Sequence, residues 1–235
     1  MRNYLIFDGK DCRDYGVYIS GSGTYNAPGR EYEQIPVPGR DGDLIGLNPR
    51  LSNIELTYPA FIYTNFRANL AAFRSMLLSR IGYKRLEDTY HPEEFRKAFY
   101  RGGAEVEARS LNDAGQFDLT FTCDPRRFLK AGEASREFTA AGTINNPTDF
   151  DSKPLIRVYG NGTLSIGSDV IDVAAGFPYI DIDSEAEDCY HGTDNANALV
   201  RMRSGDFPHL KPGPTGIGFS GSITAVRIVP KWWRV

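Results

Sequence analysis

The chain has 235 residues, and its 41% hydrophobic and 24% charged residues are typical of a globular protein. A formal net charge of -3 and a pI near 5.7 argue against specific nucleic-acid recognition, which normally uses a basic surface. No run of 18 or more apolar residues occurs, so we expect no membrane span. The 24 glycines and 14 prolines favour a turn-rich, mainly β protein, and the length favours two domains.

The apolar run near the N-terminus is too short for a signal peptide, so we expect the protein to stay in the cytosol until it is assembled. Cys12, Cys123 and Cys189 are odd in number, widely separated and without a C-x-x-C pair. They therefore predict reduced, partly buried thiols rather than a disulfide.

Strand signals open the chain at Tyr4–Phe7 and Val17–Ile19. Two further β-like runs, Glu31–Val37 and the residues from Leu44 onward, flank a segment of turn-forming residues. Glycines there can adopt positive φ at little steric cost, so this segment predicts a hairpin and not an active site. We expect the tip of this hairpin to contribute to contacts between subunits, through Gly39, Arg40, Asp41 and Gly42.

The segment Asn53–Pro59 alternates apolar and polar residues, which predicts a half-buried strand. One helix is predicted next, over Asn65–Arg80, with Thr64 or Asn65 as its cap and Gly82 closing its end. An amphipathic helix can face a membrane or a partner, but packing across a sheet is the more common arrangement. Four apolar residues share one face: Phe66, Leu70, Phe73 and Leu77.

Strands resume after the helix. Phe95–Arg101 and Ala104–Ser110 surround the pair Gly102-Gly103 and predict a hairpin. Gln116–Cys123 alternates as a half-buried strand, and we expect the following Asp124-Pro125 to end it.

A tract rich in small residues follows, so we divide the chain into domains 1–133 and 134–235. In the second domain, Asn161-Gly162 lies between two alternating runs within Pro154–Ile166, which predicts another hairpin. Short strands without a helical period predict a β-sandwich or jelly roll. The other predicted strands are Tyr179–Asp183, Ala198–Arg203, Ile217–Phe219 and Ser222–Val229.

Several motifs resemble sites but lack the required context. Gly216, Gly218 and Gly221 form G-x-G-x-x-G, yet the residues that follow alternate as a strand, whereas a dinucleotide site needs a helix there. The Gly218-Phe219-Ser220 run begins like a nucleophile elbow, but position 222 is serine.

The acidic residues around Asp181 begin like a calcium loop, but Ala186 and Gly192 stand where glycine and a carboxylate are required. His91, His191 and His209 do not have zinc-ligand spacing. We therefore assign no catalytic, cofactor-binding or metal-binding residue. Two alternatives stay open: a carbohydrate-binding module that uses Trp232 and Trp233, and a carboxylate-based hydrolase, for which no pair is singled out.

In order and spacing, several motifs resemble the distal tail protein (Dit) family of bacteriophages with long, non-contractile tails. The resemblance covers nearly the whole chain. It is carried by Phe7-Asp8-Gly9, Pro38–Gly42, Cys123–Phe128, Ile182–Glu185, Gly205–Gly213 and Ile223–Trp233.

This resemblance implies an N-terminal β-sandwich with one helix that forms a ring of six copies, and a galectin-like C-terminal β-sandwich. It implies a siphovirus tail-tip or baseplate hub that is not an enzyme and needs no cofactor. The implied partners are other copies of the chain, the tail tube protein, the tail-tip protein, the tape-measure protein and a receptor-binding protein. The implied location is the virion, after assembly in the host cytoplasm.

Overall fold

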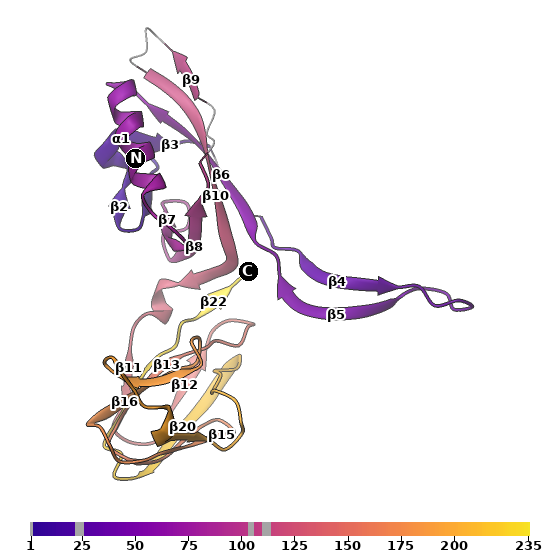
Figure 1. Ribbon diagram of the computed structural model, residues 1–235, viewed down its shortest axis with the longest axis vertical. Helices are drawn as coiled ribbons and strands as arrows, with labels where there is room; N and C mark the ends of the chain where they lie inside the picture. The colour runs from indigo at the N-terminus through magenta and orange to yellow at the C-terminus, as the bar shows by residue number, and fades with distance from the viewer. Residues whose placement is uncertain (1, 22–25, 103–105, 110–113) are drawn as a thin grey trace. The chain divides into compact units, whose positions relative to one another are not determined.

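The computed structural model describes residues 2–21, 26–102, 106–109 and 114–235. The chain divides into two compact units: unit 1, Met1–Arg127 with Val235, and unit 2, Phe128–Arg234. Figure 1 shows that both units are built mainly from strands, with one α-helix in unit 1. The expected mainly β class with a single helix is therefore confirmed. The domain boundary between residues 133 and 134 stays a prediction about independent folding.

The main sheet of unit 1 has nine strands. Seven of them follow one another in the order β2-β1-β7-β8-β10-β6-β3, and the other two pair with β10. Strand β9 pairs with β10, and so does β22 (Trp233–Arg234); the last residues of β10 belong to unit 2. The other strands are β1 (Leu5–Phe7), β2 (Lys10–Asp11), β3 (Val17–Ile19), β6 (Ile54–Ile62), β7 (Lys84–Asp88), β8 (Glu94–Tyr100), β9 (Val106–Arg109) and β10 (Ala114–Leu129).

The helix α1 (Phe66–Leu78) lies close to the short 3-10 helix η1 (Cys12–Tyr15) and to β3 and β6. All four residues of its predicted apolar face are buried in the core of unit 1, as expected from their spacing. The capping prediction is wrong in detail, because Asn65 has a left-handed backbone (φ 51°) and its side chain makes no capping hydrogen bond. The helix ends four residues before Gly82, which has φ +75°.

Two strands of unit 1 run through a proline, and the second of these prolines, Pro125, was expected to end its strand. Strand β6 runs through Pro59, whose carbonyl accepts from the Ser20 N–H at 2.8 Å. The nitrogen and the carbonyl of a strand residue point to the same side, so the Pro59 nitrogen also faces Ser20. The last β3–β6 pair is Ile19↔Ala60, so no ladder hydrogen bond requires an N–H at Pro59. Strand β10 runs through Pro125, which lies past the last β6–β10 pair, Cys123↔Ile54.

The hairpin predicted around Gly102-Gly103 is wrong in its pairing. Strand β9 pairs with β10, with Val106 opposite Phe117, while β8 lies between β7 and β10. Gly103 lies outside the described residues. Alternation identified the strands here, but it does not say which strand lies beside which.

Unit 2 consists of two packed antiparallel sheets with a core between them, which confirms the predicted sandwich. The orders are β11-β21-β13-β16-β17-β18 and β12-β20-β14-β15-β19. The strands are β11 (Arg136–Phe138), β12 (Gly142–Asn146), β13 (Leu155–Tyr159), β14 (Gly162–Ile166), β15 (Asp169–Val173), β16 (Tyr179–Asp183), β17 (Asp188–His191), β18 (Asp194–Asn195), β19 (Val200–Met202), β20 (Gly213–Gly221) and β21 (Ala225–Val229), with 3-10 helices η2 (Lys130–Gly132) and η3 (Asn197–Leu199).

The hairpin predicted at Asn161-Gly162 is also wrong, because β13 and β14 belong to different sheets. The segment is a crossover between the two layers of the sandwich. A Cβ at Gly160 or Gly162 would lie 2.2 or 2.0 Å from a backbone carbonyl oxygen of the β20–β21 segment. Asn-Gly therefore marks a close approach of two backbones here, not a two-residue turn.

Candidate interaction surfaces and buried polar groups

Strands β4 (Arg30–Ile35) and β5 (Leu44–Leu51) form the hairpin that the sequence predicts. Among the strands of the described residues, they pair only with each other, as a separate two-stranded sheet. Figure 1 shows this hairpin leaving the rest of unit 1 as a ribbon. None of its described residues belongs to the core of unit 1.

The hairpin tip is a tight turn. The Arg40 N–H donates to the Val37 carbonyl at 3.2 Å, so Pro38 and Gly39 are the central residues of a β-turn. Gly39 has φ +79° and Gly42 has φ +77°, the left-handed conformation expected for glycine in such turns. Arg40 and Asp41 are exposed at the tip, where their charges are available to a partner.

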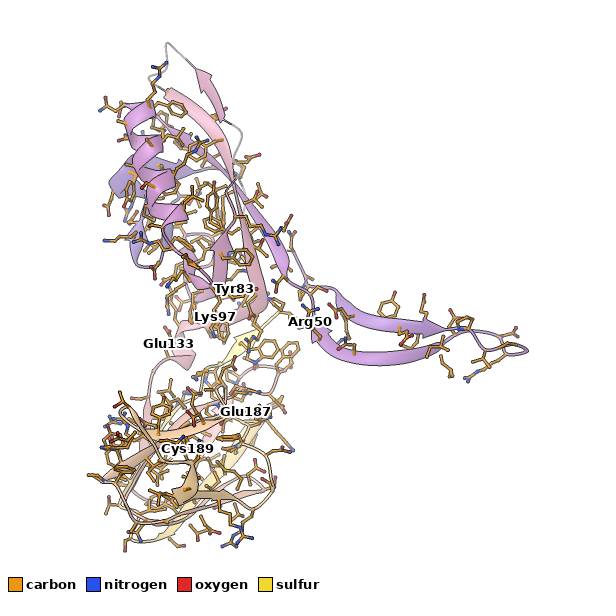
Figure 2. All side chains as sticks on the ribbon, in the orientation of Figure 1. Arg50, Tyr83, Lys97, Glu133, Glu187 and Cys189 are labelled. Carbon is orange, nitrogen blue, oxygen red and sulfur yellow. The ribbon has the colours of Figure 1, made fainter. Side chains whose placement is uncertain are left out.

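Near its base the hairpin is held by polar contacts between its own strands. Arg50 forms an ion pair with Glu31, and Asn48 Nδ2 donates to the same carboxylate at 3.2 Å. Figure 2 shows Arg50 at the end of the hairpin nearest to the rest of the unit. These contacts fix the register, but they bury little apolar surface.

The hairpin exposes large apolar side chains. Tyr32, Ile35, Leu44 and Ile45 are all more than two-fifths exposed, with Ile35 and Leu44 both at 43%. Ile35 and Leu44 face each other across the two strands and form one apolar surface, whereas Tyr32 and Ile45 lie on the opposite face of the hairpin. Exposed apolar surface of this kind indicates a protein–protein contact.

A second apolar surface lies at the C-terminal end of α1. We define the α1-end patch as Leu78, Ile81 and Tyr83, of which Ile81 is 89% exposed. Figure 2 labels Tyr83, whose ring packs edge-on against Phe99 with centroids 5.3 Å apart. The sequence analysis missed this patch, because the helical period places Leu78 off the core face and no periodicity covers the residues after it.

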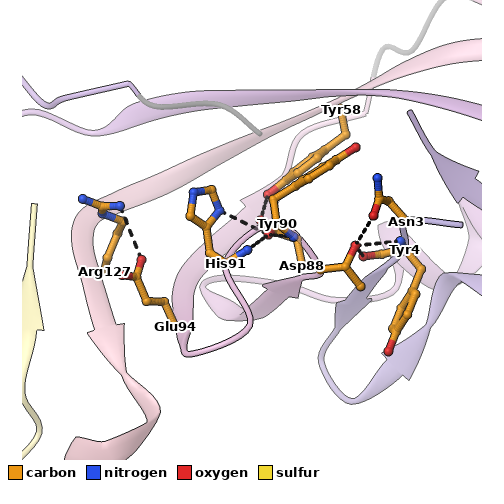
Figure 3. Close-up of polar contacts among 9 residues, drawn as sticks. Asn3, Tyr4, Tyr58, Asp88, Tyr90, His91, Glu94 and Arg127 are labelled. Atoms are coloured by element: carbon orange, nitrogen blue, oxygen red, sulfur yellow. Dashed lines mark hydrogen bonds and ion pairs between the residues drawn. The ribbon is translucent and has the colours of Figure 1, made fainter. Parts of the chain in front are cut away.

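Figure 3 shows a buried polar cluster within unit 1. One oxygen of the Asp88 carboxylate accepts from the Tyr58 hydroxyl at 2.7 Å, and the other accepts from the His91 N–H at 2.8 Å. Burial, and then the charge of Asp88, raise the pKa of Tyr58 well above its ordinary value. Tyr58 therefore stays a neutral donor, and the cluster ties β6 to the end of β7.

A buried ion pair lies close by. Glu94, at the start of β8, pairs with Arg127 of β10 at 3.4 Å, and Arg127 also donates to the Val235 carbonyl. Arg96 is buried two residues further along β8, and burial lowers the pKa of its guanidinium. Buried ion pairs of this kind hold strands in register, and we assign them no catalytic role.

The acidic residues around Asp181 do not converge on a metal. Asp181 accepts two hydrogen bonds from Arg157, at 2.7 and 2.8 Å, and Asp183 accepts from Lys231 Nζ at 2.9 Å. Both carboxylates are therefore engaged by basic side chains of unit 2. In the part of the chain that the structure describes, no group of three or more acidic, histidine or cysteine side chains could hold a metal ion.

The two tryptophans separate in the structure. Trp232 is 1% exposed in the core of unit 2, and Trp233 stacks on Phe150 with ring centroids 4.4 Å apart. The two rings are therefore not exposed side by side, as stacking of both on a sugar would require.

The three cysteines are free and buried, as expected. Burial is the main cause that raises the pKa of each thiol, to about 12 for Cys12, Cys123 and Cys189. Thiols of this kind have little nucleophilic character near neutral pH.

A cleft in unit 2 carries charges of both signs. Lys153 and Glu187 line it and pair with each other at 3.3 Å. Its other charged side chains are Asp169, Asp206 and Lys211, so the cleft does not select a ligand by charge.

Among the described helices, none is long and apolar enough to cross a membrane.

In the part of the chain that the structure describes, two β-rich units are present, and the β4–β5 hairpin of unit 1 forms a separate two-stranded sheet. No protein-family profile and no curated protein sequence matches the chain. Among solved structures, it is similar to the Dit protein of phage SPP1, described as a paradigm of the hub adsorption apparatus in phages that infect Gram-positive bacteria. That likeness covers 100% of both chains, with a TM-score of 0.79 and 16% identity.

A chain of the phage P2 baseplate, in its activated conformation with calcium, is also similar. This likeness covers 97% of both chains, with a TM-score of 0.52 and 11% identity. The resemblance to the Dit family that the motifs suggested is thus confirmed as a likeness of fold.

Proposed function

We propose that this protein is a structural hub of a long, non-contractile phage tail tip, where six copies form a ring that joins the tail tube to the tail-tip apparatus. The observation that carries the proposal is the fold, which matches SPP1 Dit over the full length of both chains. Fold alone does not define function. The hairpin and its exposed apolar residues add independent support for an assembling protein.

In this proposal, unit 1 forms the ring. A closed ring of identical copies needs a head-to-tail contact, in which two different surfaces of the chain meet. The hairpin supplies one such surface, because a two-stranded ribbon leaves backbone groups at its edges and apolar side chains on its faces for a neighbour to cover.

The proposed partners follow from a position at the distal end of the tail. They are other copies of the chain, the tail tube protein, the tail-tip protein, the tape-measure protein that passes through the bore, and a receptor-binding protein. The proposed location is the virion, after assembly in the host cytoplasm. The role is non-enzymatic, and it involves neither a cofactor nor sequence-specific recognition of nucleic acid.

Negative-stain microscopy of the purified full-length protein, with its mass from light scattering, tests the proposal. The expected result is a sixfold annulus with the mass of six chains. Dilution can dissociate a ring, so the measurement covers a concentration series that extends to the millimolar range. A protein that remains monomeric throughout, or turnover of any substrate, would contradict the proposal.

The hairpin tip provides a more specific test. Reversing both tip charges, with Arg40→Glu and Asp41→Lys together, leaves the net charge unchanged. We expect the concentration for half-assembly to rise about tenfold, equivalent to about 1.4 kcal/mol, because charges that match a neighbour become mismatched. Light scattering measures the shift.

The matched control reverses an exposed pair in unit 2, with Arg201→Glu and Asp206→Lys. It should assemble like the natural sequence. If the tip variant and this control assembled equally well, the tip charges would not contribute to the contact between subunits.

The carbohydrate-binding alternative has less support. Its basis in the sequence was the tryptophan pair, but Trp232 is buried, so only Trp233, which stacks on Phe150, is partly accessible.

A further inference from the structure

The two faces of the β4–β5 hairpin differ in chemistry. Residues directly opposite in an antiparallel pair point to the same face, and positions two apart along a strand share it. Ile35 pairs with Leu44 and Glu33 pairs with Gly46, so this face combines two adjoining aliphatic side chains with a carboxylate. We call it the Ile35 face. The opposite face carries Tyr32, Gln34 and Ile45.

An isolated two-stranded ribbon with apolar faces is only marginally stable in water. Ile35 and Leu44 are 43% exposed, although they are the kind of side chains that normally lie in a core. Glu33 packs against Gly46, where an added Cβ would lie 3.3 Å from the Glu33 Cβ. Because Gly46 has no side chain, no second side chain projects from this face beside Glu33. The Ile35 face is therefore suited to lie against a surface of matching chemistry.

The α1-end patch has the complementary chemistry. It is aliphatic through Leu78 and Ile81, and Ile81 at 89% exposure is the most exposed large apolar residue in the described chain. Tyr63, another exposed apolar residue, is a poorer candidate, because its ring already packs on Phe61 at 4.7 Å and under Arg2 at 4.7 Å.

The charges around the two surfaces have opposite sign. Residues 66–85, which include α1 and the patch, contain five basic and no acidic residues. Two of the basic residues pair with carboxylates outside this segment, Arg80 with Asp8 and Arg85 with Glu87, so the segment keeps a smaller excess of basic charge. Residues 30–51, the hairpin, contain four acidic and three basic residues, and Glu33 lies on the Ile35 face itself. A basic aliphatic surface and an acidic aliphatic surface attract each other and disfavour self-pairing of either one.

From these features we infer that the Ile35 face of one copy packs on the α1-end patch of the next copy. The inference rests on the proposed ring and supplies the two different surfaces that its contact requires. The contact is heterologous, so it can repeat from copy to copy until a ring closes.

Site-specific cross-linking tests the inference in the full-length protein. Ile35→Cys and Ile81→Cys are prepared separately, and a short bifunctional maleimide is added to each variant and to their mixture. The natural thiols are buried, so they should not react. The expected result is a covalent dimer in the mixture and none above background in either variant alone. A chain carrying both substitutions should give a ladder that ends at the closed ring.

The matched control is Gln34→Cys, the neighbouring exposed position on the opposite face. Mixed with Ile81→Cys, it should give at least tenfold less dimer. If rings form by mass and microscopy but Ile35→Cys does not cross-link to Ile81→Cys, the assigned contact is wrong and the hub proposal stands. If no variant cross-links and the protein stays monomeric in millimolar solution, both proposals fall.

Discussion

Asp183 ties together parts of unit 2 that are far apart in sequence. It lies at the end of β16, accepts from Lys231 Nζ at 2.9 Å and accepts from the Glu185 N–H at 3.0 Å. Burial alone would raise the pKa of this carboxyl, but these donors outweigh burial and hold the pKa below its ordinary value of 3.8. The ionised form is therefore the one that stabilises the fold.

The sign of the pH dependence follows. A carboxyl whose pKa is lowered by folding contributes stability above its unfolded-state pKa, and the contribution is lost as pH falls through the folded-state value. We expect Asp183→Asn to lower the free energy of unfolding at pH 7 by about 0.5–1 kcal/mol, as for a partly exposed ion pair. Urea denaturation at pH 7 and pH 3 should show this difference shrinking at the lower pH.

Asp194→Asn, at an exposed position, serves as the control and should change little at either pH. A constant difference between Asp183→Asn and the natural sequence at both pH values would show that the charge is not responsible.

Some individual residues could be assigned from the sequence and others could not. The period of two in Gln116–Cys123 identified Phe117 and Phe121 as core residues, because alternation decides which face of a strand is buried. The tip glycines were predicted for a similarly local reason. The exposure of Ile81 was not predictable, since it depends on where α1 ends relative to the sheet.

At the scale of elements, the crossover between β13 and β14 requires a residue without a side chain. Gly162 has φ +150°, and a Cβ there would lie 2.0 Å from the Ser220 carbonyl oxygen. No rotation of a side chain relieves such a contact, because both partners are backbone.

We therefore expect Gly162→Ala to lower the free energy of unfolding by at least about 2 kcal/mol. Gly216→Ala, in the partner strand β20, should change stability by less than about 0.5 kcal/mol, because its position is exposed and nothing lies within 4 Å of the added Cβ. Thermal and urea unfolding compare the two variants. Equal destabilisation would mean that the crossover is less tightly packed than the distances indicate.

At this scale the sequence predicted strand positions better than strand partners. The strand Tyr179–Asp183 has the predicted limits, because five residues of clear alternation suffice to define it. The predicted hairpins around Gly102 and at Asn161-Gly162 were wrong, because pairing between sheets depends on contacts between distant segments. Pro125 misled in a similar way, because β10 continues through it beyond its last pair with β6.

For the whole molecule, the open question is where unit 2 begins as a folding unit. The prediction from composition starts it at residue 134. In the structure, the Lys231 N–H donates to the Gly132 carbonyl at 2.8 Å, and the Leu129 N–H donates to the Trp232 carbonyl at 2.9 Å. Residues before 134 thus pair with the end of the same unit.

We expect a fragment of residues 128–235 to be more stable than a fragment of residues 134–235 by roughly 2–4 kcal/mol, from two lost hydrogen bonds and the lost apolar contact of Leu129. Circular dichroism with urea unfolding of both fragments measures the difference. Equal stability would place the folding boundary where composition predicted it.

The hydrogen bonds between the opening and closing segments of unit 2 have a further consequence. Because of these bonds, the polypeptide enters and leaves unit 2 at neighbouring points. Such a unit can change in size without changing the course of unit 1, which precedes it. For the proposed ring, this means that a change of size in unit 2 would leave the contacts made by unit 1 unaltered.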